Sequence, residues 1–106
     1  MTLKPNLKCT AEQVADAVCK ACGITLHQLI YAPKKLNVNI ARGMYCAITV
    51  MTGIHPSAAA DYIKRSRVNV ITSAKHYKGY LEVKDDVTTK LYEKIMGILQ
   101  DEHTKD

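Results

Sequence analysis

Residues 41–83 alternate helix-forming segments with stop signals, and this order constrains the fold more than any other feature of the chain. A mostly apolar segment ends before Gly53, and glycine takes the left-handed conformation after a helix at little cost. A short alanine-rich segment over residues 57–64 follows Pro56, which suits the first turn of a helix. A basic turn and a polar, cationic segment come next. The order predicts a buried helix, a short helix, a tight turn and an exposed helix.

Two capping boxes predict helix starts near the N-terminus. In each, a threonine is followed three positions later by a glutamine, at Thr10–Gln13 and at Thr25–Gln28. Apolar residues at helical spacing follow both boxes, and Gly23 supplies the stop of the first helix. The sequence therefore predicts one helix ending near Gly23 and a short second helix after Thr25.

Three further helices are predicted, and the first of them should be the central and most buried helix of the fold. Asn37 is the expected N-cap of a helix reaching Met51, whose apolar residues cover more than half its circumference. Ser66 is the expected cap of a helix over residues 67–80. Its predicted inner stripe is Val70, Ile71, Ala74 and Tyr77. The last helix, ending near Gln100, is predicted to bury Val87, Leu91, Ile95 and Ile98.

These segments together predict an all-α fold. The chain has 106 residues, enough for one domain with one core. Residues 68–71 are rich in β-branched side chains, but the serine before them and the helical spacing after them argue against a strand. We expect a single six-helix domain over residues 10–100, between an N-terminal tail (1–9) and a C-terminal tail (101–106).

The charge of the chain is basic and unevenly placed. The formal net charge is +5 and the sequence pI is about 9.1, which fits nucleic acid, an acidic partner or a soluble surface. Six cationic or histidine residues fall within residues 64–78, while carboxylates concentrate near the ends. No apolar run resembles a signal peptide or a membrane span. We therefore expect a cytoplasmic protein without a membrane partner.

No residue pattern predicts catalysis or a cofactor. The four cysteines are Cys9, Cys19, Cys22 and Cys46. Cys19 and Cys22 form a single C-x-x-C at the end of a predicted helix, which favours structural thiols over a metal site or a redox pair. The histidines are scattered, and no glycine-rich phosphate loop occurs. Asp85 and Asp86 are expected to cap the last helix. We expect a non-enzymatic protein that binds no metal.

The outer face of the helix over residues 67–80 is the main candidate site. Arg67 and Asn69 stand near its start, and these types pair bidentately with guanine and adenine. Val68 could touch a thymine methyl group. Lys75 and Lys78, further along, suit phosphate contacts. The alternative is a solvated cationic helix face without a partner.

Two other parts of the chain are candidate contact surfaces. Lys34 and Lys35 lie in a predicted loop after Pro33 and could reach DNA beside the helix, or be ordinary surface lysines. A rival function is a protein-interaction module. Its expected contact surface is an exposed seam of the last helix, made by Tyr92, Met96 and Leu99.

The chain resembles the C-terminal DNA-binding domain of the bacterial chromosomal replication initiator DnaA. The resemblance covers roughly residues 10–100 and concerns the order of the elements together with short motifs. The matching stretches are Ala41-Arg42-Gly43-Met44-Tyr45, Thr52-Gly53, the signature position Arg65-Ser66-Arg67-Val68-Asn69-Val70, and Ile71-Thr72-Ser73-Ala74-Lys75. Arg65 and Val70 are the signature residues that the chain keeps. The fold implied is a helix-turn-helix domain, similar also to Trp repressor.

The resemblance implies binding of double-stranded DNA. By position, the major-groove residues would be Arg65, Ser66, Arg67, Val68 and Asn69, with Lys34 and Lys35 as a basic loop and Lys75 on the same helix. The ATPase domain that precedes this domain in the family has no counterpart in the sequence, so we expect no ATP-driven strand opening. A replication-associated or regulatory role, in or near the nucleoid, is implied. The alternative is a homologue that kept the fold and lost DNA binding.

Overall fold

The computed structural model describes residues 9–33 and 36–104, and folds them into helices with no strand in those ranges. The helices are α1 (Ala11–Cys22), α2 (Leu26–Tyr31), α3 (Leu36–Met51), α4 (Pro56–Tyr62), α5 (Arg67–Glu82) and α6 (Asp86–Thr104). The radius of gyration of the Cα atoms is 12.4 Å, close to the value of about 13 Å expected for a compact domain of 100 residues. The predicted all-α fold class is confirmed.

Both predicted capping boxes are present. The Thr10 hydroxyl accepts the N–H of Gln13 at 3.1 Å, and the Gln13 side chain accepts the N–H of Thr10 at 2.9 Å. Thr25 and Gln28 repeat the pattern at 3.1 and 2.8 Å. Gly23 ends α1 with a φ of 69°, the left-handed conformation predicted for it. These caps satisfy N–H groups that a helix start would otherwise leave unpaired.

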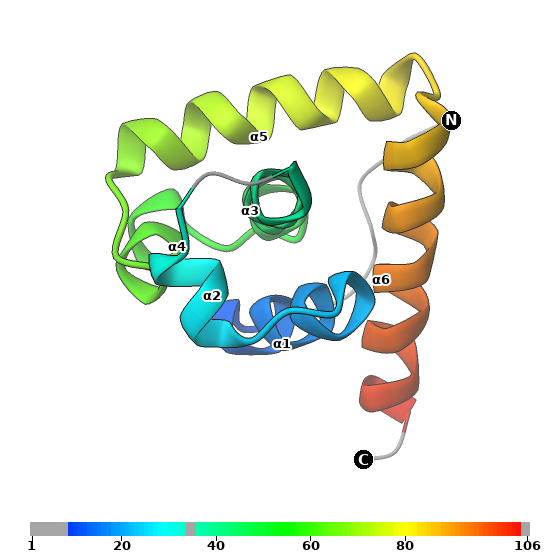
Figure 1. Cartoon of the computed structure of the whole chain (residues 1–106), viewed down its shortest axis with the longest axis horizontal. Coiled ribbons are helices and arrows are strands. Elements are labelled where there is room, and N and C mark those ends of the chain that lie inside the picture. The colour runs from blue at the N-terminus through cyan, green and yellow to red at the C-terminus, as the bar shows by residue number, and fades with distance from the viewer. Residues whose placement is uncertain (1–8, 34–35, 105–106) are drawn as a thin grey trace.

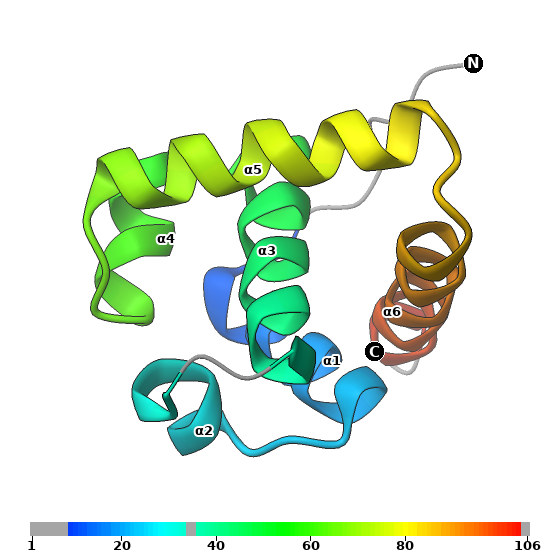
Figure 2. The ribbon, with the colours of Figure 1, turned by 45° about the horizontal axis from the view of Figure 1, so that its top comes forward.

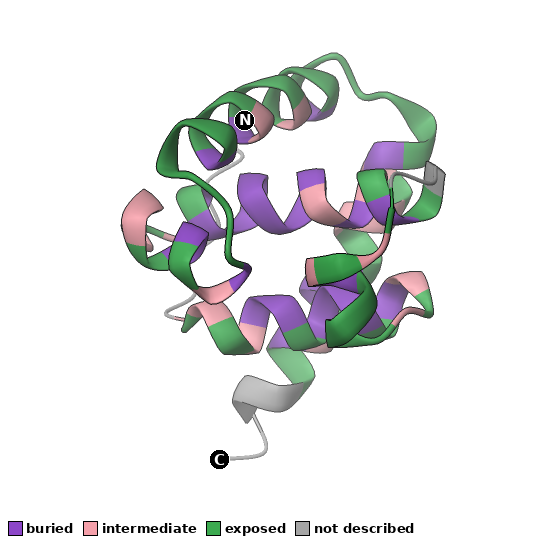
Figure 3. Ribbon diagram, turned by 60° about the vertical axis from the view of Figure 1, so that its left-hand side comes forward, coloured by how far each residue is buried: buried purple, intermediate pink, exposed green. Residues whose placement is uncertain are grey.

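Helix α3 forms the centre of the molecule. Seen nearly end-on in Figure 1, it lies between α5 above and α1 below, with α4 and α6 to its sides. Figure 2 shows α3 running from α1 up to α5, and Figure 3 shows it buried along most of its length. Met44, Tyr45 and Ile48 are fully buried. The Tyr45 hydroxyl donates to the Ala59 carbonyl at 2.8 Å and so joins α3 to α4.

Helix α5 crosses α3 where α3 has no side chain. A Cβ atom placed on Gly43 would overlap the ring of Tyr77. The ring therefore lies directly on the backbone of α3, and burial raises the pKa of its hydroxyl. Val70 and Ala74 are buried on the same side of α5. The crossing fixes which side of α5 faces the core and which side faces solvent.

Two sequence predictions about α3 and α5 are wrong. Helix α3 begins at Leu36, so Asn37 lies inside the helix and is not its N-cap. Ile71, placed in the inner stripe, is 42% exposed. Successive helical residues are about 100° apart. The stripe that meets α3 runs through Val70, Ala74 and Leu81, which leaves Ile71 at its side.

The predicted inner face of α6 is confirmed in part. Ile95 is fully buried, and Leu91 and Ile98 pack against the core, but Val87 is 61% exposed. Met96 and Leu99 are also buried, and Tyr92 is half-buried. The seam of Tyr92, Met96 and Leu99 therefore packs into the core with α1 and is not an exposed surface for a protein partner. The cause is the α1–α6 packing, which the sequence spacing alone does not define. Helix α6 also continues past Gln100 to Thr104.

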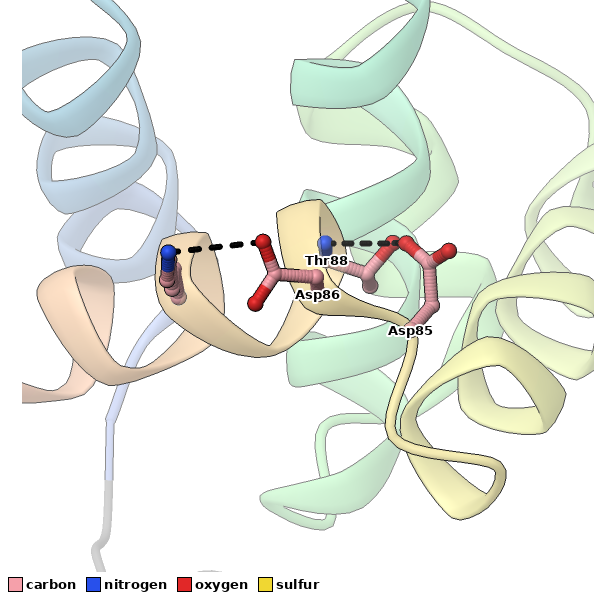
Figure 4. A network of polar contacts seen from close by, with 4 residues as sticks. Asp85, Asp86 and Thr88 are labelled. Atoms are coloured by element: carbon pink, nitrogen blue, oxygen red, sulfur yellow. Dashed lines mark hydrogen bonds and ion pairs between the residues drawn. The ribbon is translucent and has the colours of Figure 1, made fainter.

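The start of α6 is capped by Asp85, as the sequence predicted. Figure 4 shows Thr88 directed toward the Asp85 carboxylate. The Thr88 hydroxyl donates to Oδ2 at 2.7 Å and its backbone N–H donates to the same atom at 3.1 Å. These hydrogen bonds hold the pKa of Asp85 below its ordinary value. Asp86 points elsewhere and pairs with Lys90 at 3.3 Å on the surface.

Gly43→Ala is expected to destabilise the fold, and Gly79→Ala to stabilise it. Both glycines are helical, and alanine is preferred to glycine inside a helix by about 1 kcal/mol. A Cβ on Gly79 meets nothing within 4 Å, whereas one on Gly43 displaces Tyr77, and overpacking costs about 1–3 kcal/mol. Urea unfolding would measure both changes. A Gly43→Ala protein as stable as the Gly79→Ala protein would contradict the crossing described above.

Asp85→Ala is expected to lower the melting temperature most at neutral pH. The folded-state pKa of Asp85 lies below its unfolded value near 3.8, so its contribution is present above that value and is lost as the pH falls through the folded pKa. The difference in melting temperature from the parent should therefore shrink below about pH 4. Asp86→Ala serves as control and should show a smaller change. A difference that is constant from pH 7 to pH 2 would refute the cap.

Candidate nucleic-acid interface

Helices α4 and α5 are joined by a four-residue turn, Ile63–Ser66. Helix α4 ends at Tyr62, earlier than the predicted end at residue 64. Lys64 has a φ of 55°, and its N–H donates to the Asp61 carbonyl at 3.2 Å. The N–H of Arg65 donates to the Ala60 carbonyl at 2.9 Å. The two bonds close the end of α4 and redirect the chain into α5.

Ser66 is the N-cap of α5, as predicted. Its hydroxyl oxygen accepts the N–H of Asn69 at 3.1 Å. The side chain of Ser66 therefore has a structural role at the start of the helix. The cap fixes where α5 begins, and so which residues occupy its first turn.

The outer side of α5 is exposed along the helix (Figure 3). The candidate contact residues of α5 are all exposed: Arg67, Val68, Asn69, Lys75 and Lys78. Val68 is 70% exposed, although it is an aliphatic residue. No other helix of the described chain covers this side in Figures 1 and 2. The face is long, mostly polar and cationic.

The predicted site residues lie on different sides of α5. At about 100° per residue, Arg67 and Asn69 point about 160° apart. Arg67 lies in line with the buried Val70 and Ala74 but is exposed in the first turn. Asn69 lies on one flank of the outer face, together with Ser73 and His76, four and seven residues on. Val68 and Lys75 lie along the outermost line of the helix. The structure thus places all of these residues on α5 but does not gather them at one point.

A groove of about 460 Å³ lies on the Asn69 flank, between α3 and α5. Its polar lining comes from both helices and from the turn before α5. The residues that contribute polar groups include Arg42, Arg65, Asn69, Ser73 and His76. Buried Cys46 also lines the groove, and hydrogen bonding with Ser73 opposes part of the rise that burial causes in the pKa of this thiol. The groove brings Arg65 and Asn69 to one place.

Two arginines at the groove hold the end of α2. Arg42 donates from Nε to the Leu29 carbonyl and from Nη2 to the Ala32 carbonyl, each at 2.6 Å. Arg65 donates from Nη2 to the Ile30 carbonyl at 2.9 Å. These carbonyls lie at the end of α2, where no helical N–H is available to them. Arg42 is half-buried, and its donors point at α2.

The two guanidinium groups are close enough to repel each other. Burial lowers the pKa of Arg42, and the neighbouring charge of Arg65 lowers it further. Among the described residues, no carboxylate forms an ion pair with either arginine. The α2 end therefore carries uncompensated positive charge beside the start of α5.

Two predicted residues cannot be placed, and the structure adds a contact that the sequence did not predict. Lys34 and Lys35 lie outside the described residues. Tyr31 and Lys64, which meet at the end of α2, are not among the site residues predicted from the sequence. The ammonium nitrogen of Lys64 lies 5.4 Å from the centroid of the Tyr31 ring. No spacing in the sequence predicts this contact, because Tyr31 and Lys64 are far apart along the chain.

The cysteine thiols are buried or half-buried, and none resembles a reactive site. Burial raises the pKa of Cys19 to about 11 and that of Cys46 to about 12, away from the thiolate that redox or nucleophilic chemistry requires. Over the described residues, no three histidine, cysteine or carboxylate side chains gather as metal ligands. Within the same residues, no helix is both long and apolar enough to cross a membrane.

Compared with protein-family models, with curated proteins and with solved structures, the chain matches none. Its function is therefore inferred from its own residues.

Arg42→Lys is expected to destabilise the protein by about 2 kcal/mol, because one ammonium group cannot replace two charge-assisted bonds from a fixed guanidinium. Arg67→Lys, an exposed position without such bonds, should change stability by less than about 0.5 kcal/mol. Urea unfolding measures both variants, and hydrogen exchange should show faster opening of α2 in the first. Equal stability of the two variants would exclude the role assigned to Arg42.

Proposed function

We infer that this chain binds double-stranded DNA, with α4 and α5 as a helix-turn-helix and α5 as the helix that enters the major groove. The observation that carries this proposal is the exposed start of α5, with Arg67, Val68 and Asn69 in its first turn. In a helix-turn-helix, the first turns of the second helix contact base edges and the preceding helix crosses the backbone. The short α4 and the four-residue turn suit that arrangement.

The side chains at the start of α5 suit base contacts. Arg67 can donate two hydrogen bonds to guanine, Asn69 can pair with adenine, and the exposed methyl groups of Val68 can contact a thymine methyl. An aliphatic side chain that is 70% exposed would be covered in such a complex. Because Arg67 and Asn69 point to different sides of α5, we place them on different base pairs or on opposite strands.

Phosphate contacts are proposed for the basic residues around this helix. Lys75 lies further along α5, Arg65 lies in the turn before it, and Lys34 and Lys35 belong to the segment after α2. Contacts to phosphate position a protein without specifying sequence. Ser66 is proposed to act through its cap, since its hydroxyl oxygen already accepts the N–H of Asn69.

The broader role proposed is replication-associated or regulatory, at the nucleoid, without catalysis. It rests on the sequence resemblance to the DNA-binding domain of DnaA. The rival, a protein-interaction module that kept the fold without DNA binding, loses its main surface because Met96 and Leu99 are buried. The interaction module would become the favoured function if the chain failed to bind DNA.

Binding to random-sequence duplex DNA should weaken steeply with salt. Each lysine or arginine that neutralises a phosphate releases counterions and contributes about −0.9 to the slope of log K against log salt concentration. Fluorescence anisotropy at 50–200 mM salt measures the slope. Lys90→Ala/Lys94→Ala removes two charges from α6 and should leave the slope unchanged. A parent protein that does not bind even at low salt would contradict the proposal.

Arg67→Ala/Asn69→Ala is expected to reduce sequence preference more than overall binding. Each lost bidentate contact is worth about 1–3 kcal/mol of discrimination, so a site selected with the parent should lose its advantage over random duplex. Lys34→Ala/Lys35→Ala should weaken all duplexes alike. The assignment of α5 as the base-reading helix is wrong if the Arg67→Ala/Asn69→Ala variant keeps the parent's affinity for the selected site.

A further inference from the structure

Two lysines in the described chain adopt the left-handed backbone conformation, in equivalent turns. Lys64 has a φ of 55° after α4, and Lys84 has a φ of 57° after α5. In each turn, the lysine N–H donates to a carbonyl three residues back, and the next N–H donates to one five residues back. Glycine adopts this conformation with less strain. The two positions are thus a matched pair that differ in their surroundings.

The surroundings of Lys64 hold its charge in place. Its ammonium nitrogen lies over the Tyr31 ring, 5.4 Å from the centroid, and hydrogen bonding to Tyr31 raises the pKa of Lys64. The Tyr31 ring is in turn tilted against the His27 ring, with 4.9 Å between centroids. No carboxylate among the described residues pairs with Lys64. The Lys64 ammonium group is therefore held by Tyr31, is exposed to solvent and has no carboxylate partner among the described residues.

Lys64 also stands at a particular point of the surface. It directly precedes Arg65, whose guanidinium donates to the Ile30 carbonyl, so the turn is joined to the end of α2 at two points. Ser66 then caps α5. Lys64 and Tyr31 are therefore held beside the first turn of α5, whereas Lys84 lies at the opposite end of the same helix (Figure 1).

We propose that Lys64 and Tyr31 form a phosphate-binding edge of the DNA interface, which contacts the sugar–phosphate backbone beside the groove that α5 enters. This proposal rests on the DNA binding proposed above. With α5 in the groove, the turn before it lies near the adjacent backbone. A backbone phosphate oxygen would accept a hydrogen bond from the Lys64 ammonium group, which the Tyr31 ring holds in place. Contacts of this kind position the protein and do not select a sequence.

Lys64→Gly and Lys84→Gly provide the test, because each removes one positive charge and one strained conformation. Lys84→Gly should raise the melting temperature by about 4 °C or more and leave DNA binding unchanged. Lys64→Gly should remain folded with a melting temperature no lower than the parent's. Its affinity for duplex should fall, and the salt slope should become shallower by about 0.9. The affinity ratio of parent to variant should then shrink about threefold between 50 and 200 mM salt.

Tyr31→Ala supplies a second variant. It should weaken binding in the parent and have no further effect in the Lys64→Gly background, because the ring acts by holding the ammonium group. Both variants should keep the parent's ranking of different duplex sequences, which separates a phosphate contact from a base contact.

The results distinguish this proposal from the one on which it rests. If the parent binds duplex and Lys64→Gly has the same salt slope as the parent and Lys84→Gly, the phosphate edge is refuted while DNA binding stands. If the parent binds no duplex at any salt concentration, both proposals fall. A steeper loss in Lys84→Gly than in Lys64→Gly would also overturn the assignment.

Discussion

The contact between Gly43 and Tyr77 is the constraint on which the exposed surface depends. Because Gly43 lacks a side chain, the ring of Tyr77 rests on the backbone of α3, and α5 crosses α3 closely. That contact orients Val70 and Ala74 inward. The outward direction of Val68 and Lys75 then follows from helical geometry. The exposed face of α5 thus depends on one glycine of a different helix.

A second set of contacts joins the surface elements to this frame. Helix α2 is short, and its terminal carbonyls would lack partners without Arg42 and Arg65. The same guanidinium groups bring positive charge to the α2 end, where no described carboxylate compensates it. Arg65, predicted as a DNA contact, is therefore also a structural residue. The same two arginine side chains therefore cap the end of α2 and place positive charge beside α5.

Local signals predicted local structure well. The two capping boxes, the Gly23 stop, the Ser66 cap and the Asp85 cap each involve atoms a few residues apart, and each is present. Predictions that needed tertiary packing did worse. Val87 was placed inside, and Met96 and Leu99 outside, because the orientation of α6 depends on α1, and Ile71 was placed in the core for a similar reason. The Arg42 bonds to α2 join residues 10 and 13 positions apart, and no spacing rule predicts them.

The central claim is that α5 and the turn before it meet duplex DNA. Its most direct test is a titration of isotope-labelled protein with a short duplex, followed by two-dimensional NMR of the backbone amides. We predict that the largest chemical-shift changes fall on residues 63–78, with smaller changes at the end of α2 and almost none on α1 or α6. Changes concentrated on α1 and α6, with α5 unaffected, would contradict the account.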